Sequence, residues 1–383
     1  MAHHYLDHAS TSPPRPEVVA AMVDWFETSQ RGARDPGRVH SEGRVVRATV
    51  EAAREQVAAL LGTRPRQLVF TSGGTEAVNA AVWGATRARP GRPTVLADVE
   101  HSSVRDASAR AGSVLHLDVD RLGRIHPAAV HDVLDTAARD GTPAGLVHCQ
   151  WANHEVGTVQ PVGDVVEVCR RHDAWVHVDA CMAVGHLGTD LDELGADLVS
   201  VSAHKLGGPP GMGALVLRRG LRVDALIVGG DQERARRGGL ENVPGIVGFG
   251  AAAEALIEPG RLARESADAR RRTQAMAAAA TAVADVEVLG DRETRVPHLV
   301  CVTIGGVEAE PVLLGLDQAG ISAHSGSSCA SESLAPSPVL QAMGVDADHS
   351  LRLSVGWSST DDDVEAFAAA FPRVVTRLRA LRT

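Results

Sequence analysis

Residues 198–205 of the chain read LVSVSAHK: the mostly apolar run 198–201 leads through Ser202 and His204 to Lys205, and the segment GGPPG follows at residues 207–211. An apolar run closed by turn-forming residues is typical of a buried strand. Comparable runs lie along the chain at residues 68–70, 95–97, 114–117, 146–148, 175–178 and 214–217. Helix-like segments alternate with these runs, and the runs lack strict polar alternation. The pattern predicts an α/β fold with a mostly parallel sheet that helices cover on both faces.

The rest of the chain predicts a second, smaller unit. Residues 229–250 are rich in glycine and indicate a loop that leads into an alanine-rich helix at residues 249–258. Further strands are expected at residues 286–289, 299–304 and 351–355, and helices at 45–61, 261–284, 310–319 and 361–382. We therefore expect a large domain over residues 16–258 and a small α+β domain over residues 1–15 and 259–383.

Composition excludes several classes of protein. The 383 residues are 44% hydrophobic and 22% charged, which is ordinary for a globular enzyme and argues against a disordered or fibrous chain. The net charge is −10 and no basic tract occurs, so direct binding of nucleic acid is not expected. No apolar run approaches the roughly 20 residues that cross a bilayer, and the first residues lack the apolar core of a signal peptide. These features predict a cytoplasmic protein without membrane contact.

The five cysteines differ in their surroundings. Their odd number and the absence of a C-x-x-C pair fit neither a disulfide framework nor a zinc ribbon. Cys149, Cys169 and Cys301 lie in apolar or helical stretches and are expected to be buried small hydrophobes. Cys329 lies in SGSSCAS at residues 325–331, a small and polar segment in which a thiol can be exposed and its pKa moved. Cys329 is therefore the candidate for thiol chemistry.

The basic residues single out Lys205. Of 38 Lys and Arg residues it is the only lysine. A guanidinium stays protonated, whereas an ammonium can lose its proton and attack a carbonyl. Codon usage could have removed the other lysines and left this one by chance, so composition alone does not decide its role.

Polar residues gather where the predicted strands end, which is where open parallel sheets bind their ligands. The segment TSGGTE at residues 71–76 precedes a helical stretch, and glycines at a helix start favour an anion such as phosphate, although they also occur in ordinary loops. His101 follows the run at 95–97, and Asp179 ends the run at 175–178. A phosphate cradle, a carboxylate and an amine on one sheet edge predict a pyridoxal 5′-phosphate site. The P-loop pattern and the H-E-x-x-H zinc pattern, which would indicate competing sites, are absent, and no metal is expected.

Several blocks together resemble a known family. They are residues 5–11, 70–79, 153–160, 177–185, 202–213, 325–344 and 351–354, and they span nearly the whole chain. The chain resembles the cysteine desulfurases of the class V aminotransferases, specifically group I with the long active-site-cysteine loop. The resemblance implies pyridoxal-phosphate fold type I and a homodimer. It also implies conversion of L-cysteine to L-alanine, with the sulfur held on Cys329 as a persulfide for an acceptor or scaffold protein.

The resemblance also implies a role for each matching residue. Lys205 resembles the lysine that binds the cofactor, and after L-cysteine displaces it, this lysine removes the α-proton. Asp179 resembles the partner of the pyridine nitrogen, and His101 the histidine that stacks on the ring and carries protons. The remaining matches are Gly74, Thr75, Ser202 and His204 at the phosphate, Asn153 at cofactor and substrate, Arg352 at the substrate carboxylate, and Cys329 as sulfur acceptor.

Three positions depart from the family pattern. Met182 stands where a glutamine usually donates to the ring oxygen, and a thioether cannot donate. Leu240 stands where a threonine from the neighbouring subunit usually contacts the phosphate, and residues 35–40 read DPGRVH in place of N-P-S-S-x-H. Two alternatives therefore stay open: a related C–S or C–Se lyase of a specialised sulfur pathway, and a weakened member that serves as a scaffold. The acceptor pathway also stays open among iron–sulfur assembly, tRNA thiolation, DNA phosphorothioation and natural-product sulfuration.

Overall fold

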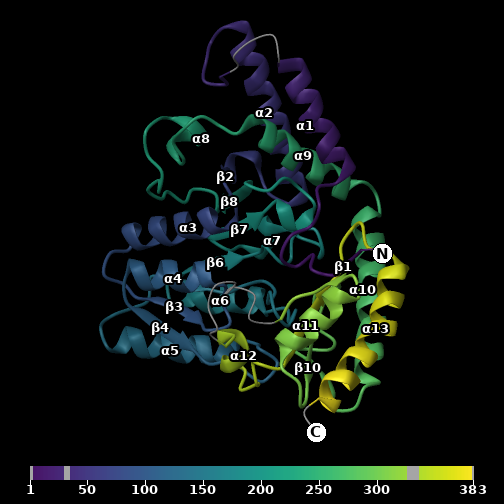
Figure 1. The fold of residues 1–383 in the computed structure, drawn as a ribbon. Coiled ribbons are helices and arrows are strands. Elements are labelled where there is room, and N and C mark those ends of the chain that lie inside the picture. Colours follow the sequence, from purple (N-terminus) through teal and green to yellow (C-terminus); the bar gives the residue numbers. More distant parts are fainter. Residues whose placement is uncertain (1–2, 30–34, 326–335, 382–383) are drawn as a thin grey trace.

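The larger of the sheets has seven strands. The computed structural model describes residues 3–29, 35–325 and 336–381, so Cys329 lies outside the described residues. The strands are β2 (Leu68–Thr71), β3 (Thr94–Ala97), β4 (Val114–Leu117), β5 (Leu146–His148), β6 (Trp175–Asp179), β7 (Leu198–Ser202) and β8 (Gly213–Leu217). Their order is β2-β8-β7-β6-β5-β3-β4, and β8 alone runs opposite to the other strands. The prediction of a mostly parallel sheet is confirmed (Figure 1).

Helices cover both faces of this sheet, because successive side chains of a strand point to opposite faces. Val69 and Leu96 pack with α3 (Gly74–Ala88) and α4 (Ser102–Ala111) on one face. Phe70 and Val95 belong to the core of the other face. The helices of that other face are α2 (Ser41–Leu60), α5 (Pro127–Arg139), α6 (Val162–Arg171) and α9 (Val243–Ile257).

A second core lies around a three-stranded antiparallel sheet. Its order is β12-β10-β9, from β9 (Val286–Leu289), β10 (Leu299–Ile304) and β12 (Ser350–Ser354). The helices α10 (Arg261–Thr281), α11 (Ala309–Gln318) and α13 (Asp361–Ala380) pack against it. The N-terminal strand β1 (His4–Tyr5) pairs in parallel with β11 (Ile321–Ser322), and Leu6 enters this core. The domain boundaries given from the sequence stay a prediction.

Two helices differ from expectation. Helix α9 begins at Val243, so the loop expected over residues 229–250 is wrong for its last part. The side chain of Asn242 caps the helix by accepting a hydrogen bond from Gly245 N, and a Cβ on Gly248 or Gly250 would lie within 3 Å of α1 or α2. Those glycines therefore serve close helix packing. Helix α1 (Pro16–Ser29) was not expected.

The remaining short elements are α7 (Leu191–Leu194), α8 (Gln232–Ala235), α12 (Pro338–Ala342) and the 3₁₀ turns η1 (Pro65–Gln67) and η2 (His204–Leu206). Among the helices in the described part of the chain, none is both long and apolar enough to cross a membrane.

Candidate active site

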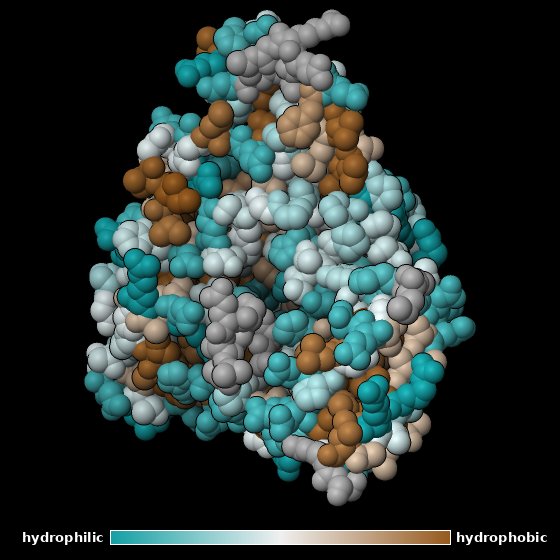
Figure 2. All heavy atoms as spheres, viewed as in Figure 1, coloured by the Kyte–Doolittle hydropathy of each residue, from teal (hydrophilic) through white to brown (hydrophobic). Residues whose placement is uncertain are grey.

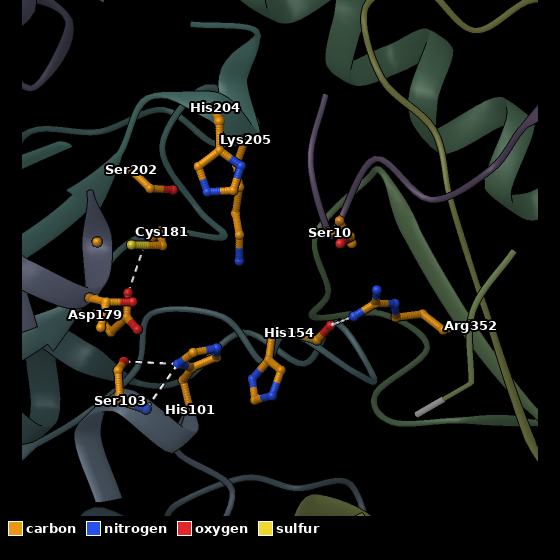
Figure 3. Close-up of a pocket in the computed structure, with 13 residues that line it drawn as sticks. Ser10, His101, Ser103, His154, Asp179, Cys181, Ser202, His204, Lys205 and Arg352 are labelled. Carbon is orange, nitrogen blue, oxygen red and sulfur yellow. Dashed lines mark hydrogen bonds between the residues drawn. The ribbon is translucent and has the colours of Figure 1, made fainter. Parts of the chain in front are cut away.

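A cavity of about 190 Å³ lies at the carboxyl ends of the parallel strands, between the two sheets (Figure 3). Its lining combines residues that follow β2, β3, β5, β6 and β7 with the N-terminal segment and β12. They are Ala9, Ser10, Gly74, Thr75, His101, Ser103, His154, Asp179, Cys181, Ser202, His204, Lys205 and Arg352. The structure therefore brings together eight residues that the sequence placed in one site: Gly74, Thr75, His101, Asp179, Ser202, His204, Lys205 and Arg352.

Lys205 lies in η2, directly after β7, and its side chain extends into the cavity (Figure 3). The amine Nζ donates to Sδ of Met182 at 3.3 Å. A thioether is only a weak acceptor. The neighbour of the amine in the cavity is therefore the uncharged and weakly accepting sulfur of Met182.

Asp179 supplies the negative charge below Lys205. Burial alone would raise the pKa of this carboxyl, but the nearby His101 and the Cys181 backbone N–H, which donates to Oδ1 at 3.0 Å, outweigh burial and lower the pKa. Asp179 is consequently ionised at neutral pH. A buried carboxylate in this position can pair with a cationic ring nitrogen.

His101 caps helix α4 and faces the cavity. Its Nδ1 accepts a hydrogen bond from Ser103 N at 3.1 Å and lies 2.8 Å from Ser103 Oγ. The ring stands edge-on to His154, with 5.1 Å between centroids. Because Nδ1 accepts from a backbone N–H, the neutral ring carries its proton on Nε2.

Glu100, next to His101 in sequence, is a buried carboxyl that sequence reasoning missed. It is 0% exposed, and Oε1 accepts from Gln150 N at 2.6 Å. Oε2 has no hydrogen-bond partner among the described residues. Burial and the charge of Asp179 raise the pKa of Glu100 to about 8. Of these two neighbouring carboxyls, Asp179 is therefore charged and Glu100 mostly neutral at pH 7.

The start of helix α3 forms an anion cradle. Gly73 precedes it with φ 154°, a conformation that favours glycine. A Cβ on Gly74 would lie 2.7 Å from Sγ of Cys181, so only glycine leaves this floor free. The buried Oγ of Ser202 has no hydrogen-bond partner among the described residues. A bound phosphate would accept from this hydroxyl and from the N–H groups of the helix start, so the cradle fits the phosphate of pyridoxal 5′-phosphate.

His204 forms part of the same wall. Its Nδ1 lies 3.1 Å from Oγ1 of Thr11 in the N-terminal segment. Burial and the adjacent Lys205 lower the pKa of His204 to about 4. Without a bound anion the ring is neutral at pH 7, and its N–H can donate a hydrogen bond to a phosphate.

Arg352 closes the opposite side of the cavity. It extends from β12 and is 2% exposed. One guanidinium nitrogen donates to the carbonyl of His154 at 3.0 Å, and the other to Oδ1 of Asp7 at 2.9 Å. These contacts hold the guanidinium in one orientation at the cavity, where it can bind a carboxylate.

Asn153 is fully buried and is absent from the lining of the cavity. Its amide donates to the carbonyl of Val99 at 3.2 Å and accepts from the backbone N–H groups of Glu155 and Val156 at 2.8 Å each. In the structure these bonds shape the loop that carries His154. Its expected contact with cofactor and substrate stays a prediction.

His154 lines the cavity without having been predicted, and Leu240 was singled out in the sequence but does not line it. His154 was not assigned a role, although its place after β5 follows the same strand-end rule that singled out Asp179. Leu240 is 64% exposed and is not among the lining residues of this cavity. In the described part of the chain, no group of three or more His, Cys, Asp or Glu residues is arranged to hold a metal.

Comparisons with known proteins agree over the whole chain. The family model for aminotransferase class-V matches residues 4–367. A putative cysteine desulfurase, IscS 1, from Bacillus subtilis is 39% identical over 99% of this chain and 100% of its own length. The cysteine desulfurase IscS from Methanosarcina thermophila is 36% identical over 98% of this chain and 92% of its own length.

Solved structures give the same picture. A NifS-like protein superposes with a TM-score of 0.88 at 27% identity, covering 98% of this chain and 100% of its own. SspA in complex with cysteine superposes with a TM-score of 0.79 at 27% identity, over 93% of this chain and 100% of its own.

Proposed function

The chain belongs to the aminotransferase class-V family and is a cysteine desulfurase; from this premise we propose that it binds pyridoxal 5′-phosphate at Lys205 and passes the sulfur of L-cysteine through Cys329. One observation carries the proposal. The only lysine, an ionised carboxylate and an open anion cradle line the same cavity.

We assign the residues that would hold the cofactor as follows. Lys205 binds its aldehyde carbon, Asp179 its pyridine nitrogen, and the cradle of Gly74, Thr75, Ser202 and His204 its phosphate. His101 is assigned to the face of the ring and Asn153 to a supporting contact with cofactor and substrate. When bound, the cofactor supplies an electron sink for negative charge at the substrate α-carbon.

The protein itself positions the substrate and moves protons. Arg352, already oriented by Asp7 and His154, binds the carboxylate of L-cysteine and fixes the α-carbon towards Lys205. The Nζ amine of Lys205, once free, takes the α-proton. Nε2 of His101 holds a second proton at the cavity, where it can be given to the departing product.

The described residues on either side of the segment that contains Cys329 contact one residue that lines this cavity, Arg352, and the neighbour of another, His154. On one side, His324 pairs with Arg352 through the backbone, with Arg352 N donating to His324 O at 2.6 Å. On the other side, Oγ of Ser337 donates to Oε2 of Glu155, the neighbour of His154, at 2.5 Å. We infer that the Cys329 thiolate attacks the sulfur of bound cysteine. The S–S bond forms as the C–S bond breaks, and the carbon product takes up protons and leaves as alanine.

Assembly and sulfur delivery complete the proposal. We propose a homodimer, because Val19, Val23 and Phe26 lie on one face of α1 and are 50%, 47% and 54% exposed. Figure 2 shows the hydrophobic surface over this part of the molecule. An acceptor or scaffold protein would then take the sulfur from Cys329. We propose that this happens in the cytoplasm, because a reducing compartment keeps a thiol free. We assign the chain to the group with the long cysteine loop.

A turnover assay tests the role of Cys329. The holoenzyme with L-cysteine and a reductant is expected to release sulfide and alanine in equal amounts. Cys329→Ala should nearly abolish turnover, whereas the neighbouring Ser328→Ala serves as the matched control. Alanine release that survives Cys329→Ala would favour the related lyase, and selenocysteine as a competing substrate would then identify it. If the native chain itself shows no activity, the result would favour a weakened member that acts as a scaffold.

A labelling experiment tests the role of Lys205 separately. Borohydride reduction of the holoenzyme should fix the cofactor on the peptide that contains Lys205, and mass spectrometry locates the label. Because no other lysine exists, a label elsewhere in the chain would contradict the assignment.

A further inference from the structure

A second cavity, of about 250 Å³, lies beside helix α10 and shares no residue with the candidate active site. Its walls come from α10, from β9 and from the segment that precedes β10. The polar lining residues are Arg270, Thr273, Gln274, Thr281, Arg292 and Arg295. The apolar lining residues are Ala277, Ala278, Val288, Val296 and Pro297. The cavity therefore gathers three guanidinium groups and no acidic side chain.

The three arginines have no counterion in the described part of the chain. Arg270, Arg292 and Arg295 form no ion pair there, although the whole chain carries a net charge of −10. The next two residues of the same helix behave differently, because Arg271 and Arg272 both pair with Asp361, at 2.8 and 3.0 Å. The two arginines that directly follow Arg270 on this helix thus have a counterion that the three cavity arginines lack.

Arg295 has a buried donor that no described residue of the protein satisfies. One of its nitrogens donates to the carbonyl of Leu299, but the buried Nε has no hydrogen-bond partner among the described residues. Burial and the neighbouring positive charge of Arg270 lower the pKa of Arg295 to about 10. Leaving a buried charged donor unpaired is costly, and an anion between the two guanidinium groups would remove both penalties.

We propose that this cavity binds a dianionic oxyanion, namely phosphate or the phosphate group of a small ester. Guanidinium groups donate in pairs to the oxygens of such an anion, and three of them match a double negative charge better than the single charge of a carboxylate. The amide of Gln274 adds a neutral donor, whereas the hydroxyls of Thr273 and Thr281 already donate to backbone carbonyls. The apolar wall that includes Val288 and Pro297 leaves room for the carbon part of an ester.

Titration calorimetry of the holoenzyme with inorganic phosphate tests this site. The cofactor then fills the cradle near Lys205, so phosphate is free to bind only elsewhere. We expect one phosphate per chain, with an affinity that falls as ionic strength rises because charge–charge attraction is screened. Acetate at the same ionic strength should bind at least about tenfold more weakly, since it offers a single charge.

Variants locate the binding. Arg295→Gln and, independently, the exposed Arg292→Gln should each weaken phosphate binding about tenfold or more, because each change removes one guanidinium that donates charge-assisted hydrogen bonds to the anion. If Arg295→Gln fails to fold because Arg295 is buried, Arg292→Gln alone tests the site. Arg271→Gln is the matched control and should leave binding unchanged. The proposal is overturned if wild-type holoenzyme shows no saturable phosphate binding or if acetate binds as tightly. It is also overturned if neither Arg292→Gln nor Arg295→Gln weakens binding, or if Arg271→Gln weakens it as much as Arg292→Gln.

Discussion

Replacing Glu100 with glutamine is expected to remove a pH-dependent loss of stability from the folded chain. The carboxyl is fully buried, and burial together with the charge of Asp179 raises its pKa from 4.5 to about 8. Between these two pH values the folded chain holds a proton on Glu100 that the unfolded chain has lost. The free energy of unfolding therefore falls as the pH rises through this window. Below the window Glu100 has no effect on stability, and above it Glu100 lowers stability by the full amount.

The magnitude follows from the difference between the two pKa values. Each pH unit inside the window costs about 1.4 kcal/mol for one proton. At pH 7 the penalty amounts to roughly 3 kcal/mol, which is an upper limit because the unfolded chain retains some structure. Glutamine cannot ionise, and its carbonyl oxygen can still accept from Gln150 N. Glu100→Gln should therefore be more stable than the wild type at pH 7 and nearly equal to it at pH 4.5.

Urea unfolding of both chains at equal subunit concentration, at several pH values from 5 to 8, measures this difference. The gap in unfolding free energy should widen by about 1.4 kcal/mol per pH unit. Infrared spectroscopy at pH 7 should show the C=O stretch of a protonated carboxyl in the wild type and lose it in Glu100→Gln. The exposed Glu287→Gln is the control and should run parallel to the wild type. If Glu100→Gln also runs parallel to it, or if the infrared band is absent from the wild type, the assignment of a neutral Glu100 is wrong.

Three further predictions concern the cavity itself. Gly74→Ala places a Cβ 2.7 Å from Sγ of Cys181, so the cradle should retain the cofactor at least about tenfold more weakly in equilibrium dialysis; unchanged retention would refute the cradle. Met182→Gln gives Lys205 an amide neighbour in place of a thioether and should shift the pH at which the absorbance of the bound cofactor changes, whereas a superimposable pH profile would show that Met182 has no influence. Arg352→Lys keeps the charge but loses the paired donors, so KM for L-cysteine should rise about tenfold or more with a smaller change in kcat; an equal loss in kcat alone would contradict a role in binding the carboxylate.

The strands of the large sheet could be predicted to within one residue, because each is a short, nearly continuous apolar run between turn-forming residues. The helix α9 could not be placed correctly, because its glycines look like a loop in the sequence and reveal their packing role only against α1 and α2. Helix α1 escaped prediction for a different reason. Val18, Met22 and Trp25 pack against the core, but Val19, Val23 and Phe26 on another side remain exposed, so the apolar residues of α1 do not form one narrow stripe in the sequence.

The candidate site was predictable where the strand-end rule applies. Asp179, His101 and Lys205 follow strands of one parallel sheet, and the topology of such a sheet brings their side chains to one edge. Arg352 belongs to the other sheet, so only the resemblance to a family pointed to it. Glu100 could not be recognised, because its neutral state depends on complete burial near Asp179, a relation that sequence spacing does not reveal.

The N-terminal segment sets an order on how the site can be completed during synthesis. Strand β1 pairs with β11, Ala9 and Ser10 line the cavity, and Asp7 holds Arg352. Residues 4–10 can therefore take their places only after residues beyond 350 have been made. Such distant contacts form slowly. The large sheet, with Lys205 at its edge, is made before residue 218, whereas the side of the cavity formed by residues 7–10 and Arg352 can be completed only once the chain is nearly full length.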